Sequence, residues 1–319
     1  MEIELSIIVV NWNGGTLLTK AIDSILAFPP SVEFEVVVID NGSTDDSVGL
    51  LRSSDSAKLL KDRLRITLNT ENRGFGAANN QGFQTTDSPL VLLLNPDSEI
   101  TEGSIDRLVR AVRADTKIGA AGPRILNPDG SLQISVWRNP PAAWNIILSS
   151  LKLYLLLPKK LRGELLLGGH WDHNRARAVP MLGGAAMVVR REVIRTVGGF
   201  DERYHMYGED HEWCLRMSRA GWVLMFEPEA VVFHQGGWSS LQRWSNLEKT
   251  RIQLEAYYQF QKDALGRGRL MRNIFAYWLT VSAQHLWRRV RRVDAPDVKL
   301  IMEIYWEHLR RTVRNSPVN

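Results

Sequence analysis

Four short apolar runs without polar alternation recur along the first hundred residues. They cover residues 6–12, 35–39, 64–68 and 91–94, and polar or turn residues follow each of them. Runs of this length and composition predict strands that are buried on both faces of a parallel sheet. Helical spacing over 16–28 and a Ser/Thr/Asp cluster before Ser47 predict the connecting helices. The pattern therefore predicts an α/β fold with right-handed crossovers.

Polar side chains follow these predicted strands at the point where each one ends. Pro96 cannot continue a sheet ladder, so the fourth strand must stop near Asn95 and leave Asp97 just beyond it. The carboxyl ends of parallel strands meet at one rim, which is where open α/β sheets bind their ligands. Each residue alone also fits an ordinary turn or helix cap, but the set predicts a binding cleft. Its members are Asn11, Asp40, Asn72, Gly74 and Asp97.

These residue types suit a nucleotide and its diphosphate. A carboxylate at position 97 is suited to holding a divalent cation against a diphosphate. Asp40 is able to accept a hydrogen bond from the imide N–H of a uracil or thymine ring. Gly74 permits close backbone approach to a ligand, and its neighbours Asn72 and Arg73 are placed to contact ribose or diphosphate. Arg73 fits a solvated surface charge equally well.

Two further segments carry candidate chemistry in the second half. Glu209 and Asp210 open a segment with helical apolar spacing, which favours either a dipole-stabilised helix start or a general base. His234 ends an apolar strand and is followed by Gly236-Gly237. Such a histidine is either structural or, together with a carboxylate, a ligand for a transition divalent metal.

Composition restricts the class of protein. The 319 residues are 44% hydrophobic and 24% charged, which is typical of a soluble globular protein. The single cysteine, Cys214, excludes an intrachain disulfide and suits a reducing compartment. The first residues lack the basic start of a secretory signal, and no apolar run reaches the roughly 20 residues that span a bilayer. A cytoplasmic location is therefore expected.

The net charge of +5 is mildly basic, with a pI of about 9.4. The basic residues form no aromatic-interleaved groove, so nucleic acid is not an expected partner. Apolar stretches beside basic clusters at 144–162 and 270–292 fit peripheral contact with an anionic membrane surface, here the cytoplasmic face of the inner membrane. They fit equally a buried helix in the first case and a helical cap or homodimer contact in the second.

Five blocks, taken together and in order, resemble glycosyltransferase family 2, the GT-A fold, and in particular its rhamnosyltransferase-like branch. They are S-I-I-V-V-N-W-N; V-V-V-I-D-N-G-S-T-D; N-R-G-F-G-A-A-N-N-Q-G; L-L-L-N-P-D-S; and G-G-F-D-E-R-Y-H-M-Y-G-E-D-H-E-W-C-L-R with F-H-Q-G-G-W-S. The resemblance implies a Rossmann-like, mostly parallel sheet flanked by helices. It implies a catalytic domain over 1–240, with a nucleotide-sugar half to about residue 100 and an acceptor half after it. A C-terminal helical extension would then cover 241–319.

The resemblance also implies roles for particular residues. Asp210 would be the catalytic base with Glu209 beside it, and Asp97 and His234 would hold Mn²⁺ or Mg²⁺. Asn95 stands where the family's D-x-D motif has its first carboxylate, which leaves one protein carboxylate at that motif. The nucleotide-sugar set would be Asn11, Asp40, Asn41, Asn72, Arg73, Gly74, Asn80, Asn95 and Asp97. The acceptor side would be His211, Glu212 and Trp238.

The implied activity is inverting transfer of a sugar from a nucleoside-diphosphate sugar to a hydroxyl of a glycan or polyprenyl-diphosphate-linked saccharide. L-rhamnose from dTDP-rhamnose is the first expectation, with galactofuranosyl or hexosyl donors as the alternative. Two other classes compete with this one. A non-catalytic nucleotide-sugar-binding protein would tolerate the loss of Asp210. A sugar-phosphate nucleotidyltransferase would carry basic residues in the loop after the first strand, and the loop at 11–15 has none.

Overall fold

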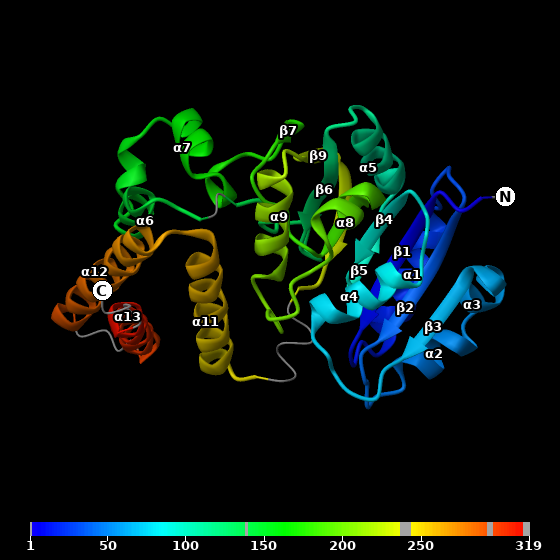
Figure 1. Cartoon of the computed structure of the whole chain (residues 1–319), viewed down its shortest axis with the longest axis horizontal. Helices are drawn as coiled ribbons and strands as arrows, with labels where there is room; N and C mark the ends of the chain where they lie inside the picture. The colour runs from blue at the N-terminus through cyan, green and yellow to red at the C-terminus, as the bar shows by residue number, and fades with distance from the viewer. Residues whose placement is uncertain (1, 138–139, 237–243, 292–295, 315–319) are drawn as a thin grey trace. The chain divides into compact units, whose positions relative to one another are not determined.

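The computed structural model describes residues 2–137, 140–236, 244–291 and 296–314. Within these ranges the chain divides into two compact units. One unit comprises residues 1–137 and 173–243, and the other comprises residues 138–172 and 244–319. Each unit is considered by itself (Figure 1).

The first unit is built on one mixed sheet. The described strands follow the order β3-β2-β1-β4-β8-β6-β9-β5, and β7 pairs with β9 (Figure 1). Strands β3, β2, β1 and β4 are parallel neighbours, as the apolar runs predicted. β8, β5 and β7 run antiparallel to their neighbours, so the second half of the sheet is mixed. The strands are β1 Leu5–Asn11, β2 Phe34–Asp40, β3 Leu64–Leu68, β4 Leu90–Leu94, β5 Ser98–Ile100, β6 Ile118–Leu126, β7 Arg177–Ala178, β8 Ala186–Arg190 and β9 Val223–His234.

Helices cover the sheet because its central strands are apolar on both faces. All seven residues of β1 are buried, since it lies between β2 and β4. One hydrophobic core joins these strands to the apolar residues of α1 and α5. A Cβ at Gly82 of α4 would meet Ile8 of β1 at 2.7 Å, so glycine lets α4 lie close against the sheet. The helices of this unit are α1 Thr16–Ala27, α2 Ser47–Ser53, α3 Asp55–Leu60, the 3₁₀ turn η1 Lys61–Arg63, α4 Phe75–Gln84, α5 Ser104–Arg113, α8 Arg191–Val197 and α9 Glu209–Arg219.

The second unit is helical. α12 packs against both α6 and α13, and the core contains Tyr258, Leu270, Ile274 and Tyr305. In the part that the structure describes, no helix has the length and apolar character to pass through a membrane. The elements are α6 Ala143–Ser150, η2 Leu153–Leu156, α7 Lys159–Leu166, η3 Gly168–His170, α11 Asn246–Ala264, α12 Arg267–Val290 and α13 Pro296–Arg314.

The unit boundary differs from the division expected at residue 240. Residues 138–172 were assigned to the catalytic part, whereas the structure groups them with the C-terminal helices. The contacts give the reason: the Asn273 amide donates to the Pro141 carbonyl at 2.8 Å, and the Gln284 amide donates to the Ser150 carbonyl at 2.9 Å. These pairs are more than 130 residues apart in the chain. Local periodicity carries no signal for contacts of that range.

Candidate active site

Asn11 and Asp40 lie side by side at the rim because they end neighbouring parallel strands in register. The Asn11 amide donates to Asp40 Oδ1 at 2.7 Å, and the Ser43 hydroxyl donates to the same oxygen at 2.6 Å. The Ser43 backbone N–H donates to Asp40 Oδ2 at 3.1 Å. Asp40 thus stabilises its own turn. The Oδ1 atom of Asn11 is buried, and no hydrogen-bond partner for it lies within the described part of the chain.

Asn41 holds the loop that follows β3. Its amide donates to Asn72 Oδ1 at 3.0 Å and to the Gly74 carbonyl at 3.2 Å. The side-chain oxygen of Asn41, Oδ1, accepts a hydrogen bond from the Arg73 backbone N–H at 3.0 Å. Gly74 has a φ of 91°, and a Cβ there would lie 2.7 Å from the carbonyl oxygen of His205. Asn41, Asn72 and Gly74 therefore form one rigid group at the rim, while the Arg73 side chain is exposed.

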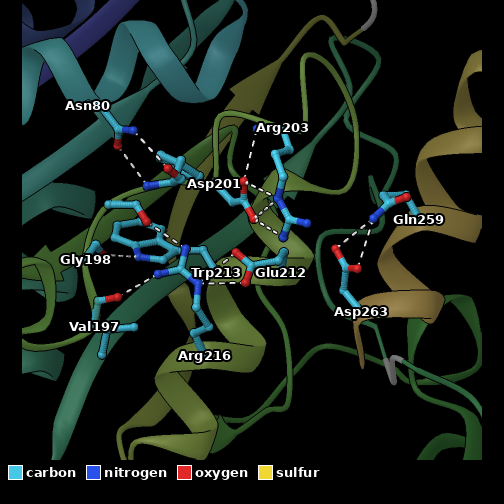
Figure 2. A network of polar contacts seen from close by, with 12 residues as sticks. Asn80, Val197, Gly198, Asp201, Arg203, Glu212, Trp213, Arg216, Gln259 and Asp263 are labelled. Atoms are coloured by element: carbon cyan, nitrogen blue, oxygen red, sulfur yellow. Dashed lines mark hydrogen bonds and ion pairs between the residues drawn. The ribbon is translucent and has the colours of Figure 1, made fainter. Parts of the chain in front are cut away.

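Asn80, which was expected near the nucleotide, is occupied elsewhere. Its amide donates to the Phe200 carbonyl at 2.9 Å and to Glu202, and its Oδ1 accepts from the Phe200 N–H at 2.8 Å (Figure 2). A side chain with these three partners fixes the loop before α9. The structure gives it this anchoring contact and does not group it with Asn41 and Asn72.

The D-x-D-like segment lies against His234. The Nε2 atom of His234 is 3.1 Å from Asp97 Oδ1 and 3.1 Å from the Asn95 amide nitrogen. The antiparallel pairing of β5 with β9 places Ser98 opposite His234, and the Gln235 N–H donates to the Asp97 carbonyl at 3.0 Å. Both the Asp97 and His234 side chains are about nine-tenths buried. Two residues that are 137 positions apart in the chain thus lie within contact distance of each other.

Asp210 is joined to that pair through a two-residue bridge. The Gly184 N–H donates to Asp210 Oδ2 at 3.1 Å, and the carbonyl of the next residue, Ala185, accepts from the Asn95 N–H at 2.9 Å. The His211 N–H donates to Asp210 Oδ1 at 2.8 Å, as expected at a helix start. Asp210 and Asn95 are therefore both hydrogen-bonded to the 184–185 segment, at adjacent residues. The Gly-rich run at 183–184 was visible in the sequence, but its bridging role was not.

Glu209 is the most perturbed carboxyl of this region. Burial, as the larger cause, and the neighbouring Asp210 charge together raise the pKa of Glu209 from 4.5 to about 8. Its Oε2 is buried and has no hydrogen-bond partner among the residues that the structure describes. At neutral pH the Glu209 side chain is therefore mostly protonated, so it is a proton donor beside Asp210 rather than a second base.

This raised pKa predicts how stability depends on pH. Between about 4.5 and about 8 the folded chain retains the Glu209 proton that the unfolded chain has lost, so this group makes stability fall as the pH rises. Glu209→Gln removes this dependence, and we expect the variant to be more stable than the wild type at pH 9 and similar to it at pH 5. Urea unfolding at the two pH values measures the difference. Equal pH dependence in both proteins would contradict the raised pKa.

The three residues expected on the acceptor side, His211, Glu212 and Trp238, differ in what the structure shows of their surroundings. His211 packs edge-to-face on Trp137, with ring centroids 5.2 Å apart. The Glu212 carboxylate is held by Arg216 at 2.7 and 2.9 Å, and Arg216 also donates to the carbonyls of Val197 and Gly199 (Figure 2). Glu212 therefore serves as a partner for Arg216. Trp238 lies outside the described residues.

Trp137 is a site residue that sequence reasoning missed. It lies beside His211, whose Nε2 is 3.9 Å from Asp210 Oδ1. A Cβ at Gly183 would lie 3.3 Å from the Trp137 ring. An indole beside a candidate base is suited to stacking on the apolar face of a sugar ring. In the sequence Trp137 is a single aromatic residue after the turn at 127–130, and no strand-end or helix-start pattern distinguishes it.

Asn95, Asp97 and His234 suit a divalent cation that also binds a diphosphate. Asp97 supplies a carboxylate oxygen and His234 an imidazole nitrogen. Asn95 Oδ1 is buried and has no partner in the ranges that the structure describes. Within the described ranges no three or more His, Cys, Asp or Glu side chains form a complete metal-binding group. A cation here would therefore need further oxygen ligands, which a diphosphate and water provide. This donor set fits Mn²⁺ or Mg²⁺.

Comparisons with protein families and with known proteins show what the chain is similar to. A family model described as "Glycosyl transferase family 2" matches residues 6–198, and one described as "Glycosyl transferase family group 2" matches residues 167–309. An "N-acetylglucosaminyl-diphospho-decaprenol L-rhamnosyltransferase" of Mycobacterium tuberculosis strain H37Rv is 30% identical over 256 residues, covering 72% of this chain and 75% of that protein. The "Low-salt glycan biosynthesis hexosyltransferase Agl10" of Haloferax volcanii is 29% identical, covering 68% of this chain and 62% of that protein.

Two solved structures share the fold. The mannosyltransferase PcManGT of Pyrobaculum calidifontis, solved with GDP-Man and Mn²⁺, has a TM-score of 0.57 at 16% identity and covers 100% of this chain and 77% of its own. GalNAc-T7, solved with UDP, GalNAc and Mn²⁺, has a TM-score of 0.60 at 17% identity and covers 98% of this chain and 56% of its own. The family match covers more than half of the chain. The chain is therefore a glycosyltransferase of the GT-A fold and belongs to glycosyltransferase family 2.

Proposed function

We propose that the chain is an inverting rhamnosyltransferase that uses dTDP-L-rhamnose and acts on a polyprenyl-diphosphate-linked saccharide during cell-surface polysaccharide synthesis. The observation that carries this proposal is the hydrogen-bonded connection between the Asn95–Asp97 segment, against which His234 lies, and Asp210 through Gly184 and Ala185. The rhamnose donor and the lipid-linked acceptor are inferred from the mycobacterial relative, which is named for both.

Asp210 is proposed as the general base. One of its oxygens is held by the Gly184 N–H and the other by the His211 N–H, so the carboxylate is oriented, and among the described residues each oxygen has one donor and so retains a lone pair. The acceptor hydroxyl attacks the anomeric carbon and gives its proton to Asp210. The bond from that carbon to the diphosphate oxygen breaks, and its electron pair leaves with the diphosphate. One displacement inverts the anomeric configuration and needs no covalent enzyme intermediate.

Asp97 and His234 are proposed to hold the divalent cation at the leaving group. When bound, the cation neutralises charge on the departing diphosphate as a Lewis acid. The nucleotide itself is assigned to the rim formed by Asn11, Asp40 and Asn41. The unpartnered Oδ1 of Asn11 supports this assignment, since a buried acceptor without a partner is costly unless a ligand donates to it.

A donor screen tests the proposal. The full chain is incubated with Mn²⁺ and an N-acetylglucosaminyl-diphosphate-prenyl acceptor, and dTDP-rhamnose is compared with UDP-galactofuranose, UDP-hexoses and GDP-mannose. We expect transfer with dTDP-rhamnose at least about tenfold faster than with the others. Preferential transfer of a hexose would replace rhamnose in the proposal, and absence of transfer with every donor would favour a non-catalytic sugar-nucleotide-binding protein.

The helical unit is proposed to contact an anionic membrane surface, at the cytoplasmic face of the inner membrane, where such an acceptor would be reached. On α12, Phe275, Leu279, Leu286 and Val290 are 46–77% exposed and recur at the spacing of one helix face. Trp287 is 56% exposed, and the Arg291 guanidinium lies 4.4 Å from its ring centroid. An apolar stripe that ends in arginine suits an interface of acyl chains and anionic headgroups. A second copy of the chain is the competing partner for this stripe.

A charged substitution on this apolar stripe distinguishes a membrane surface from a second copy of the chain as its partner. We expect the wild type to float with vesicles containing anionic lipid and Leu286→Glu to bind about tenfold more weakly, because it loses apolar contact and adds repulsion. Leu59→Glu is the matched control, since Leu59 is 67% exposed on α3. Sedimentation of both variants reports the oligomeric state. A wild-type dimer that Leu286→Glu dissociates, without vesicle binding, would assign the stripe to a homodimer instead.

A further inference from the structure

The nitrogen of His234 that faces away from Asp97 is held by Gln133. His234 Nδ1 lies 2.6 Å from Gln133 Oε1. The amide nitrogen of Gln133 donates to Asn127 Oδ1 at 2.8 Å and to the His234 backbone carbonyl at 3.3 Å. Because both neighbours of that nitrogen are carbonyl oxygens, the Gln133 amide has only this orientation. Its Oε1 must therefore accept a hydrogen bond from a protonated His234 Nδ1.

The turn after β6 fixes the direction of this chain of hydrogen bonds. Asp129 accepts from the Ser131 hydroxyl at 2.6 Å and from the Ser131 N–H at 2.9 Å. These bonds hold the pKa of Asp129 below its usual value, so its carboxylate is an acceptor only. The Ser131 oxygen then accepts from the Asn127 amide at 2.9 Å, which turns Asn127 Oδ1 toward Gln133. Each donor is thus determined by the one before it, from Asp129 to His234.

We propose that Gln133 is a positioning residue that keeps the His234 ring proton on Nδ1, so that the Nε2 lone pair faces Asp97 and Asn95. A metal-binding imidazole needs a bare nitrogen toward the cation and a hydrogen-bond acceptor behind the other nitrogen. The segment from Asn127 to Gln133 supplies that acceptor with a direction set by Asp129. This inference rests on the proposed metal role of His234.

Gly236 contributes the space that the Gln133 amide needs. It has a φ of 68°, and a Cβ there would lie 2.9 Å from the Gln133 amide nitrogen. Gly236→Ala would therefore displace the Gln133 amide although residue 133 remains a glutamine. This variant tests the geometry independently of any substitution at Gln133.

Binding of Mn²⁺ to the full chain, with and without dTDP, measures the effect by the loss of the free Mn²⁺ electron paramagnetic resonance signal. We expect Gln133→Met and Gly236→Ala to weaken Mn²⁺ binding by about 10–100-fold. Gln133→Glu retains an acceptor opposite Nδ1, and we expect it to bind Mn²⁺ close to the wild-type affinity. Gln253→Met, on an exposed position of α11, is the matched control and should change nothing.

The ring proton itself is observed in a long-range ¹H–¹⁵N spectrum of the metal-free chain with labelled histidine, assigned with His234→Gln. We expect a protonated Nδ1 in the wild type and loss of that proton in Gln133→Met. A bare Nδ1 in the wild type, or wild-type Mn²⁺ affinity in Gln133→Met, would overturn the inference. If His234→Ala and Asp97→Asn also bind Mn²⁺ normally, the proposed metal site itself fails. If only these two weaken binding, the metal site stands and the role of Gln133 fails.

Discussion

Asp210→Asn is expected to lower kcat for sugar transfer by about 10²–10⁴-fold while leaving the affinity for the nucleotide nearly unchanged. The amide keeps the size of the carboxylate and is able to accept from the Gly184 N–H, so the loop that bridges to Asn95 should remain folded. What is lost is the basic oxygen that receives the acceptor proton. Transfer kinetics and dTDP binding, measured on the same preparation, separate the two effects.

A second carboxylate provides the control for this experiment. Asp62 is exposed in the turn between α3 and β3, and Asp62→Asn should leave both kcat and dTDP binding unchanged. Wild-type turnover in Asp210→Asn would show that the base lies elsewhere. Loss of dTDP binding in the same variant would indicate that Asp210 supports the structure rather than the chemistry.

Asp97→Asn is expected to lower kcat/KM by about 10²–10³-fold. The substitution removes the one carboxylate of the Asn95-Pro96-Asp97 segment. The His234 ring then faces a neutral amide at position 97 instead of an anionic oxygen. Stabilising the charge of a leaving diphosphate is worth several kcal/mol, and each 1.36 kcal/mol corresponds to a tenfold change in rate. Turnover at several Mn²⁺ concentrations measures the loss.

His234→Ala removes one neutral ligand and keeps the carboxylate, so its effect should be smaller. We expect its activity to recover partly as Mn²⁺ is raised, whereas Asp97→Asn should recover less. Activity that does not depend on a divalent metal in the wild type, together with unchanged rates in both variants, would contradict the assignment of this pair.

The first half of the site was predictable because it depends on local rules. Pro96 ends β4 at Leu94, and parallel pairing in register brings Asn11 next to Asp40, so the strand ends alone located this rim. His234 was identified in the same way, as the end of an apolar strand beside glycines. Its contact with Asp97 follows from the pairing of β5 with β9.

Other residues depend on contacts that no local pattern reports. Glu212 and Asn80 were expected to face ligands, but the structure shows Glu212 bonded to Arg216 and Asn80 bonded to the 200–202 loop. Gln133 follows an ordinary turn sequence, and only the three-dimensional path to His234 gives it a role. The apolar spacing of segment 138–172 suits several environments. Its grouping with the C-terminal helices could therefore be recognised only from long-range contacts such as the one between Asn273 and Pro141.

The position of a bound Mn²⁺ ion tests the central claim most directly. Crystals of the full chain grown with Mn²⁺ and dTDP would locate the metal by its anomalous scattering. We expect a single strong peak within about 2.0–2.4 Å of Asp97 and of His234 Nε2, with the diphosphate beside it and Asp210 across the 184–185 bridge. A manganese peak on another face of this unit, with Asp97 and His234 paired only to each other, would contradict the proposed active site.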